Sequence, residues 1–170
     1  MITTPTLSAE PGQPQSLTGS DATVKAVNGA IDGARLVHLA AHGDLRSDNP
    51  LFSSFRLADG PQTVYDLQCL SDAPDVVVLS ACNSALSQVD AGDELLGLVA
   101  SLLAFGTSTA VAAVLPISDL ATVPLMDRLH QRIAAGDGPG RALSTAVSHL
   151  DLDEPASVAA CAAFVCLGAA

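Results

Sequence analysis

The two stretches that decide the fold are residues 36–43, which read LVHLAAHG, and residues 75–84, which read DVVVLSACNS. Residues 36–41 and 75–80 are short, mostly aliphatic runs in which apolar positions follow one another without alternation. Strands that are buried on both faces of a sheet have this pattern. Residues 110–115 form a similar run, so the chain carries three strands typical of the centre of a parallel sheet.

Helical patterns lie between and after these strands. The clearest covers residues 93–105, where leucine and valine form a wide apolar stripe that Gly106 ends. Other expected elements are a helix over residues 21–32 capped by Asp21, a small hairpin around Asp59 and Gly60, helices over 120–135 and 141–150, and a strand over 162–167. Strands that alternate with helices pair in parallel through right-handed crossovers. We therefore expect an α/β fold of three layers, with a mostly parallel open sheet and helices on both faces.

Length and composition indicate one domain behind a short tail. The 170 residues suit a single unit of common size. Residues 1–16 hold three prolines among Ser, Thr, Gln and Gly, with too few apolar positions to offset the entropy of ordering. We expect a flexible tail or linker there, and a folded domain over residues 17–170.

Charge and targeting signals narrow the expected partners and location. Eighteen acidic and seven basic residues give a net charge of -11. Such a field repels phosphate backbones and anionic membrane surfaces, so neither nucleic acid nor a membrane is an expected partner. The N-terminus has no basic region followed by an apolar one, and the chain has no long uninterrupted apolar run. A cytoplasmic location is the expectation.

The cysteines and glycines give no sign of a metal or an organic cofactor. Cysteines at positions 69, 82, 161 and 166 form no CxxC pair, and no Gly-rich phosphate loop occurs. We therefore expect no metal and no cofactor. Cys161 and Cys166 lie in an apolar run and are predicted to be core residues.

A histidine and a cysteine follow two of the predicted strands. In parallel α/β sheets, ligands bind beyond the carboxyl ends of the strands, where the first run leads to His42 and the second to Cys82. If the two strands are neighbours, the His42 imidazole can take the proton of the Cys82 thiol and make it a nucleophile. The backbone N–H groups of Gly43 and Cys82 can then stabilise a tetrahedral oxyanion.

The same residues also fit an inert interpretation, in which His42 is a loop histidine and Cys82 a small residue at a strand end. The remaining histidines have weaker signals. His130 is predicted to be a surface or partly buried side chain, and His149 a cation at a helix C-terminus. His38 lies four residues before His42, and even separation along a strand places both on one face, which indicates a structural or supporting role.

The sequence resembles the CHAT family, caspase-like domains related to separase. The resemblance rests on residues 36–43 and 78–84, and continues in the same order through NPLFS at 49–53, LADG at 57–60, GDELLGL at 92–98 and AFVCLG at 163–168. It covers roughly residues 17–168 and implies a caspase-type fold with a Cys–His dyad. His42 is then the base, Cys82 the nucleophile, and Gly43 part of the oxyanion hole.

The relation to separase further implies that Asp119 reads a basic P1 side chain of the substrate. A carboxylate that pairs with arginine is a sound basis for such selection. Asp119 also fits as the N-cap of the helix that begins near residue 120.

The resemblance implies a cysteine endopeptidase that acts on a protein or peptide substrate and prefers a basic P1 residue. Three departures favour an alternative, a catalytically silent CHAT-type regulatory or protein-interaction module. The chain lacks the family's usual first strand and its helical repeats, and Leu115 stands where members commonly have tryptophan. An activating protein, or the missing N-terminal repeat region, is therefore a further expected partner. A small-molecule hydrolase is the third interpretation, and it requires an apolar pocket.

Overall fold

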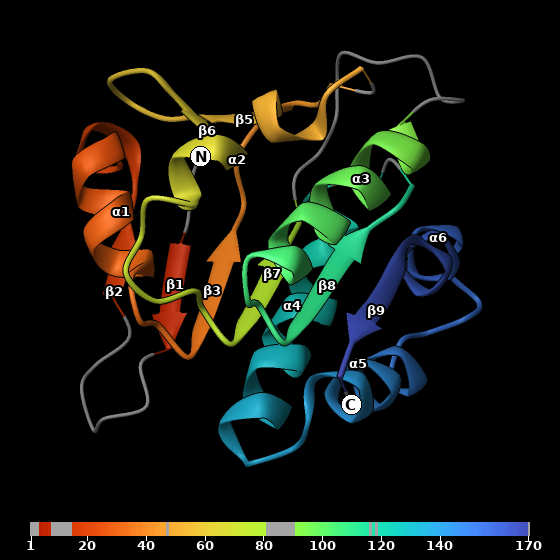
Figure 1. The fold of residues 1–170 in the computed structure, drawn as a ribbon. Helices are drawn as coiled ribbons and strands as arrows, with labels where there is room; N and C mark the ends of the chain where they lie inside the picture. Colours follow the sequence, from red (N-terminus) through yellow and green to blue (C-terminus); the bar gives the residue numbers. More distant parts are fainter. Residues whose placement is uncertain are drawn as a thin grey trace.

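The computed structural model describes residues 4–7, 15–46, 48–80, 91–115, 117 and 119–169. A central sheet runs through the molecule, with helices on both sides (Figure 1). Its six strands lie in the order β2-β1-β3-β7-β8-β9. They span Thr4–Leu7 (β1), Gln15–Leu17 (β2), Leu36–Leu39 (β3), Val76–Leu79 (β7), Thr109–Ala113 (β8) and Phe164–Gly168 (β9).

The three strands predicted from the aliphatic runs form the parallel centre of this sheet. β3 pairs in parallel with β7, and β7 pairs in parallel with β8. At the outer positions the pairing is antiparallel, between β8 and β9, between β1 and β3, and between β1 and β2. The α/β class is confirmed, and the last strand differs from the simple alternation because its first residue, Phe164, lies beside Ala113 at the end of β8.

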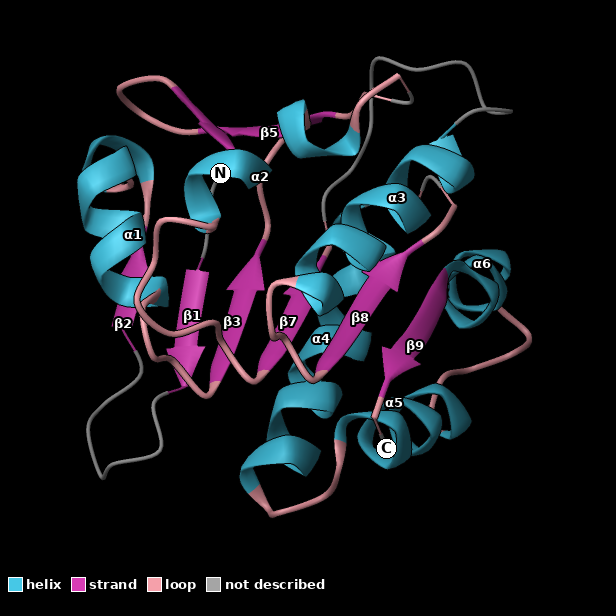
Figure 2. Cartoon of the chain, in the orientation of Figure 1, coloured by secondary structure: helices cyan, strands magenta, loops and turns pink. Residues whose placement is uncertain are grey.

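Helices cover both faces of the sheet, as predicted (Figure 2). The bounds are Val24–Ile31 (α1), Ala91–Ala104 (α3), Asp119–Ala134 (α4), Pro139–Ser148 (α5) and Pro155–Ala163 (α6). Along the strands, alternate residues enter different cores: Val77 and Leu79 pack with α1 and α3, whereas Val78 packs with α4, α5 and α6. Three layers result, with one apolar core on each side of the sheet.

Two helices differ from the prediction: α1 begins at a different residue, and α6 was not expected. The N-cap of α1 is Thr23, whose side chain accepts a hydrogen bond from the Ala26 N–H at 3.3 Å. Asp21 lies in a preceding 3₁₀ turn, η1 (Gly19–Asp21), because the fully buried Ala22 separates that turn from the helix. Helix α6 was not predicted, since its alanine-rich sequence shows no distinct apolar stripe.

Strands β1 and β2 lie within or across the segment predicted to be a flexible tail. Thr6 and Leu7 of β1 pair with Val37 and Leu36 of β3. β1 lies between β2, the outermost strand, and β3, and backbone pairing with both neighbours holds it without a run of apolar side chains. The composition of residues 1–16 therefore gave no sign of these strands.

A second, three-stranded antiparallel sheet lies above the carboxyl ends of the central strands (Figure 1). It consists of β4 (Gly43–Asp44), β5 (Ser54–Arg56) and β6 (Pro61–Thr63). The predicted hairpin is confirmed, because β5 and β6 pair across a turn in which the Leu57 N–H donates to the Gly60 carbonyl at 3.0 Å.

Two short helices complete this region and contact the long helix α3. They are η2 (Pro50–Phe52) and α2 (Val64–Leu67), the second of which is capped by Thr63 and Asp66 in a capping box. Helix α3 approaches η2 so closely at Gly97 that a Cβ there would lie 2.8 Å from the Pro50 Cγ. The long helix thus holds the small sheet region against the main domain.

Candidate active site

His42 lies just past the carboxyl end of β3, where the chain enters the small sheet. Its side chain is exposed, while its backbone carbonyl accepts a hydrogen bond from the Arg56 N–H of β5 at 2.8 Å. The backbone is therefore held on one side by β3 and on the other by β5. This arrangement presents an imidazole to solvent from a fixed point of the main chain.

The backbone N–H of Gly43 is directed away from β5. Gly43 pairs with Phe55, and the hydrogen bond from the Arg56 N–H to the His42 carbonyl makes this a non-hydrogen-bonded pair of the antiparallel ladder. In such a pair the N–H groups point outward, away from the partner strand. Because β4 is an edge strand of the small sheet, the Gly43 N–H faces the outer side of that sheet.

The charged groups beside His42 are paired with each other. Asp44 forms an ion pair with Arg56 at 3.2 Å, and Asp48 forms one with Arg46 at 2.9 Å. The hydrogen bond from Arg46 lowers the pKa of Asp48. Since all four side chains are exposed, these pairs contribute little to stability.

Strand β7, which precedes the predicted nucleophile in the sequence, ends beside the end of β3. β3 and β7 are adjacent and parallel, and the Ser80 N–H donates to the Leu39 carbonyl at 3.2 Å. The neighbouring strands that the dyad requires are therefore present. Cys82 itself lies outside the described residues, so the His42–Cys82 contact stays a prediction.

Asp119 is the first residue of α4, following the carboxyl end of β8. Its side chain is not among those described, so its two predicted roles, reading a basic P1 residue and capping the helix, both stay predictions. Leu115, which stands at the tryptophan position of the resemblance, is half exposed close to the same strand end.

Three side chains near the carboxyl ends of β3 and β7 form a hydrogen-bonded chain that the sequence did not indicate. The His38 Nε2 lies 2.5 Å from the Ser80 Oγ, and the His38 Nδ1 lies 2.9 Å from the His130 Nε2. These three residues, the Ser80–His38–His130 chain, join β3, the end of β7 and α4. The supporting role expected for His38 thus has a geometric basis.

Burial disfavours the charged form of both histidines in this hydrogen-bonded chain. His38 is 7% exposed, and burial, assisted by repulsion from His130, lowers the pKa of His38 to about 3. Burial likewise lowers the pKa of His130, against an opposing attraction from Asp127. A neutral imidazole has one donor and one acceptor nitrogen, so each bond of the chain pairs a donor with an acceptor.

His130 takes the second of its two predicted states, a partly buried side chain. It is partly buried and lies on the face of α4 that packs against the sheet, one turn after the buried Met126. The four-residue spacing from Met126 was the feature of the sequence that could have indicated this burial. The predicted place of His149 at a helix C-terminus is confirmed, because it caps α5 with its Nδ1 2.8 Å from the Thr145 carbonyl oxygen, while its role as a cation stays a prediction.

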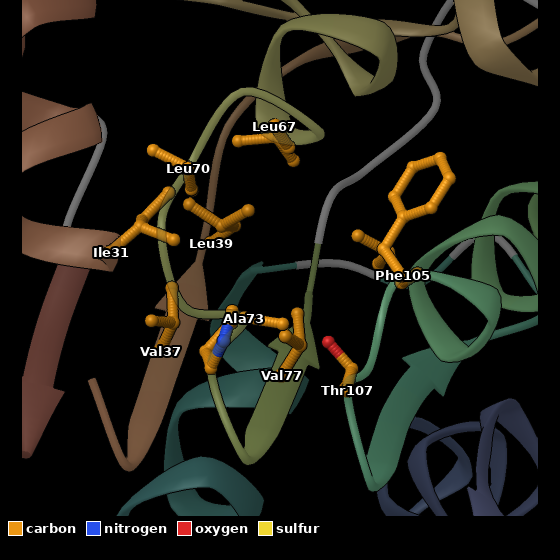
Figure 3. A pocket seen from close by; sticks show the side chains of 11 residues that line it. Ile31, Val37, Leu39, Leu67, Leu70, Ala73, Val77, Phe105 and Thr107 are labelled. Carbon is orange, nitrogen blue, oxygen red and sulfur yellow. The ribbon is translucent and has the colours of Figure 1, made fainter. Parts of the chain in front are cut away.

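An apolar pocket lies on the opposite face of the sheet from the Ser80–His38–His130 chain (Figure 3). It is lined by side chains that include Ile31, Val37, Leu39 and Val77, with the Thr107 hydroxyl beside them. Its volume of about 20 Å³ is that of a single water molecule, whereas small-molecule sites measure several hundred. This pocket therefore gives no support to the small-molecule hydrolase interpretation.

Further properties of the described residues concern metal binding, membrane spans and free thiols. Within the described part of the chain, no group of three His, Cys, Asp or Glu side chains is placed to hold a metal ion. None of the helices there is long and apolar enough to cross a membrane. Cys69 is exposed, while Cys161 and Cys166 are partly buried, and burial raises the pKa of the Cys166 thiol.

A three-layer α/β fold whose first central strand leads directly into a His-Gly pair defines the class of caspase-like domains. Comparison with known families makes the assignment specific: the CHAT domain family matches residues 5–169. The chain belongs to the CHAT domain family, as its sequence motifs predicted. A search of curated proteins found no match.

Proposed function

We propose that this chain is a cysteine endopeptidase of the caspase-like type, with His42 as the base and Cys82 as the nucleophile. The observation that carries the proposal is the CHAT assignment over residues 5–169, together with the parallel pairing of β3 and β7. That pairing supports the proposal because β3, which precedes His42, and β7, which precedes Cys82 in the sequence, end side by side.

The proposed reaction uses the chain's own groups and water. His42 takes the proton of the Cys82 thiol, and the sulfur attacks the carbonyl carbon of the peptide bond. The N–H groups of Gly43 and Cys82 stabilise the oxyanion, and protonated His42 gives its proton to the leaving amine as the C–N bond breaks. Water then attacks the thioester with His42 as base, which releases the acid and restores the thiol.

The outward direction of the Gly43 N–H supports its part in this reaction. A Cβ on Gly43 would meet the Ser54 carbonyl oxygen at 3.6 Å, an ordinary contact. A Gly43→Ala variant is therefore expected to fold normally, while the added methyl group obstructs the approach of a substrate carbonyl. We expect its acylation rate to fall roughly 10²-fold or more, the range that loss of an oxyanion contact produces.

The proposed substrate is a protein or peptide with a basic P1 side chain, which Asp119 would bind. The net charge of -11 supports this choice, because it attracts basic polypeptides over acidic ones. A carboxylate binds the arginine guanidinium through two parallel hydrogen bonds, whereas it repels an acidic P1 residue.

The proposal is tested with peptidyl electrophiles that carry Arg, norleucine or Asp at P1 and a thiol-reactive group. Because Cys69 is exposed, all proteins carry Cys69→Ser, and adducts are located by mass spectrometry. We expect labelling of Cys82 by the Arg compound, its loss in Cys82→Ala and a large decrease in His42→Ala. His149→Ala is the matched control, since His149 is also an exposed histidine.

Two outcomes would contradict the proposal. If Cys82 reacts no faster than an ordinary thiol and His42→Ala changes nothing, the chain is a silent interaction module rather than a peptidase. If the reaction depends on His42 but Arg and Asp at P1 react equally, the dyad stands and the basic preference is wrong.

A further inference from the structure

The strand that leads to the proposed base and the strand that leads to the proposed nucleophile are linked by side chains as well as by backbone. His38 belongs to β3, which leads to His42, and Ser80 follows β7, which leads toward Cys82. Their side chains meet at 2.5 Å, beside the backbone bond from the Ser80 N–H to the Leu39 carbonyl. This side-chain bond therefore lies where the two strands end.

His130, the third residue of the Ser80–His38–His130 chain, connects the His38–Ser80 bond to helix α4. His38 faces α4, because its neighbours Val37 and Leu39 pack in the opposite core. Its Nδ1 lies 2.9 Å from the His130 Nε2. The imidazole of His38 is thus held at both nitrogens, once by α4 and once by the end of β7, and its ring orientation is fixed.

Ser80 and His38 resemble the nucleophile and base of a serine hydrolase, but the electrostatics argue against that role. A general base must carry a proton during the reaction, and the pKa of His38 is about 3. At pH 7 only about one molecule in 10⁴ would carry it. His38 therefore acts as a neutral hydrogen-bonding group, not as a base.

We propose that His38 is a positioning residue that fixes Ser80 through their side-chain hydrogen bond and thereby sets the distance between Cys82 and His42. The inference rests on the proposed function. Ser80 is two residues before Cys82, so the two Cα atoms are at most about 7 Å apart along the chain. A shift of Ser80 is therefore passed to the nucleophile, and a displacement of about 1 Å can cost up to 10²-fold in rate.

Two amide substitutions of His38 separate its two hydrogen bonds. The amide nitrogen of His38→Gln reaches the position of Nε2 and keeps the bond to Ser80, whereas that of His38→Asn reaches the position of Nδ1 and keeps only the bond to His130. Ser80→Ala removes the link from the other side. We expect His38→Gln to label Cys82 within about 3-fold of the wild-type rate, and His38→Asn and Ser80→Ala to fall roughly 10-fold.

The matched control is Thr109→Val. The Thr109 hydroxyl is buried like the link and donates to the Ala169 carbonyl at 2.5 Å, but it lies at the opposite end of the sheet, where β8 begins. Its loss removes a comparable hydrogen bond without touching the link. We expect the wild-type labelling rate in this variant.

The experiment measures the rate at which iodoacetamide alkylates Cys82 from pH 5 to pH 10, in the Cys69→Ser protein and each variant. A dyad that is correctly spaced keeps the thiolate at lower pH than an ordinary thiol. We expect Ser80→Ala and His38→Asn to move the midpoint of this profile upward by about one pH unit or more, toward that of His42→Ala. Urea unfolding at pH 8 establishes that each variant is folded.

The outcomes separate this inference from the proposed function. Folded Ser80→Ala and His38→Asn proteins that keep the wild-type rate and midpoint, in a protein whose labelling depends on His42, would overturn the positioning role and leave the dyad intact. An equal change in Thr109→Val would also overturn it, because the effect would then follow from lost stability alone. If wild-type labelling does not depend on His42, the proposed function fails and this inference fails with it.

Discussion

Acidification should destabilise the protein through His38, by an amount that its pKa determines. The folded pKa of about 3 lies below the ordinary value of 6.5, so the folded state binds its proton less readily than the unfolded state. This difference in pKa adds to the free energy of unfolding in full above pH 6.5, and the contribution is lost as the pH falls toward 3. At pH 5, roughly 1.5 pH units below the ordinary value, the loss is about 2 kcal/mol. His130, whose pKa is also lowered, contributes in the same direction.

The measurement is urea unfolding at pH 8 and pH 5, on the wild type and on His38→Gln. Carboxylates titrate in both proteins, so the informative quantity is the difference between their two losses of unfolding free energy. We expect the wild type to lose about 2 kcal/mol more than the variant between the two pH values. Losses that agree within about 0.5 kcal/mol would show that His38 is not buried in its neutral form, and would refute the reasoning.

Three substitutions test the packing of the fold. Gly97→Ala places a Cβ 2.8 Å from the Pro50 Cγ, so overpacking should cost about 1–3 kcal/mol in urea unfolding, and an unchanged midpoint would refute the close contact. Gly168→Ala should cost more than about 3 kcal/mol in the same assay, because Gly168 has a φ of +113° and its Cβ would overlap the Ser108 carbonyl oxygen. Gln62 is 1% exposed, and its amide has no hydrogen-bond partner among the described residues, so Gln62→Met should raise thermal stability by the equivalent of about 1–2 kcal/mol; a lower melting temperature would indicate a bound partner.

The central part of the fold was predictable because its signal is local. Residues 76–79 are four consecutive aliphatic residues, three of them the β-branched valine, which is typical of a strand buried on both faces. Strand β1 carries no such signal, since it is held by backbone pairing with β3. Helix α6 was missed because its short, alanine-rich sequence shows no distinct apolar stripe.

The candidate site divides in the same way. His42 and Gly43 come shortly after β3 ends, so the prediction of that strand also gave their position in the fold. The Ser80–His38–His130 chain depends on how α4 docks on the sheet, because the two histidines are 92 positions apart in the sequence. Sequence spacing indicated a supporting role for His38 but not its partners, because such long-range contacts leave no local pattern.

The antiparallel pairing of the outer strands determines where attachments to the chain emerge. β1 runs opposite to β3, so it begins at the edge of the sheet where β3 ends and His42 follows. β9 runs opposite to β8, so it finishes at the other edge, where β8 begins. An affinity tag or fluorescent protein fused before β1 would therefore emerge beside the proposed catalytic groups. One fused after β9 would emerge at the far edge, which makes the C-terminal side the better choice for immobilising the protein in a substrate screen.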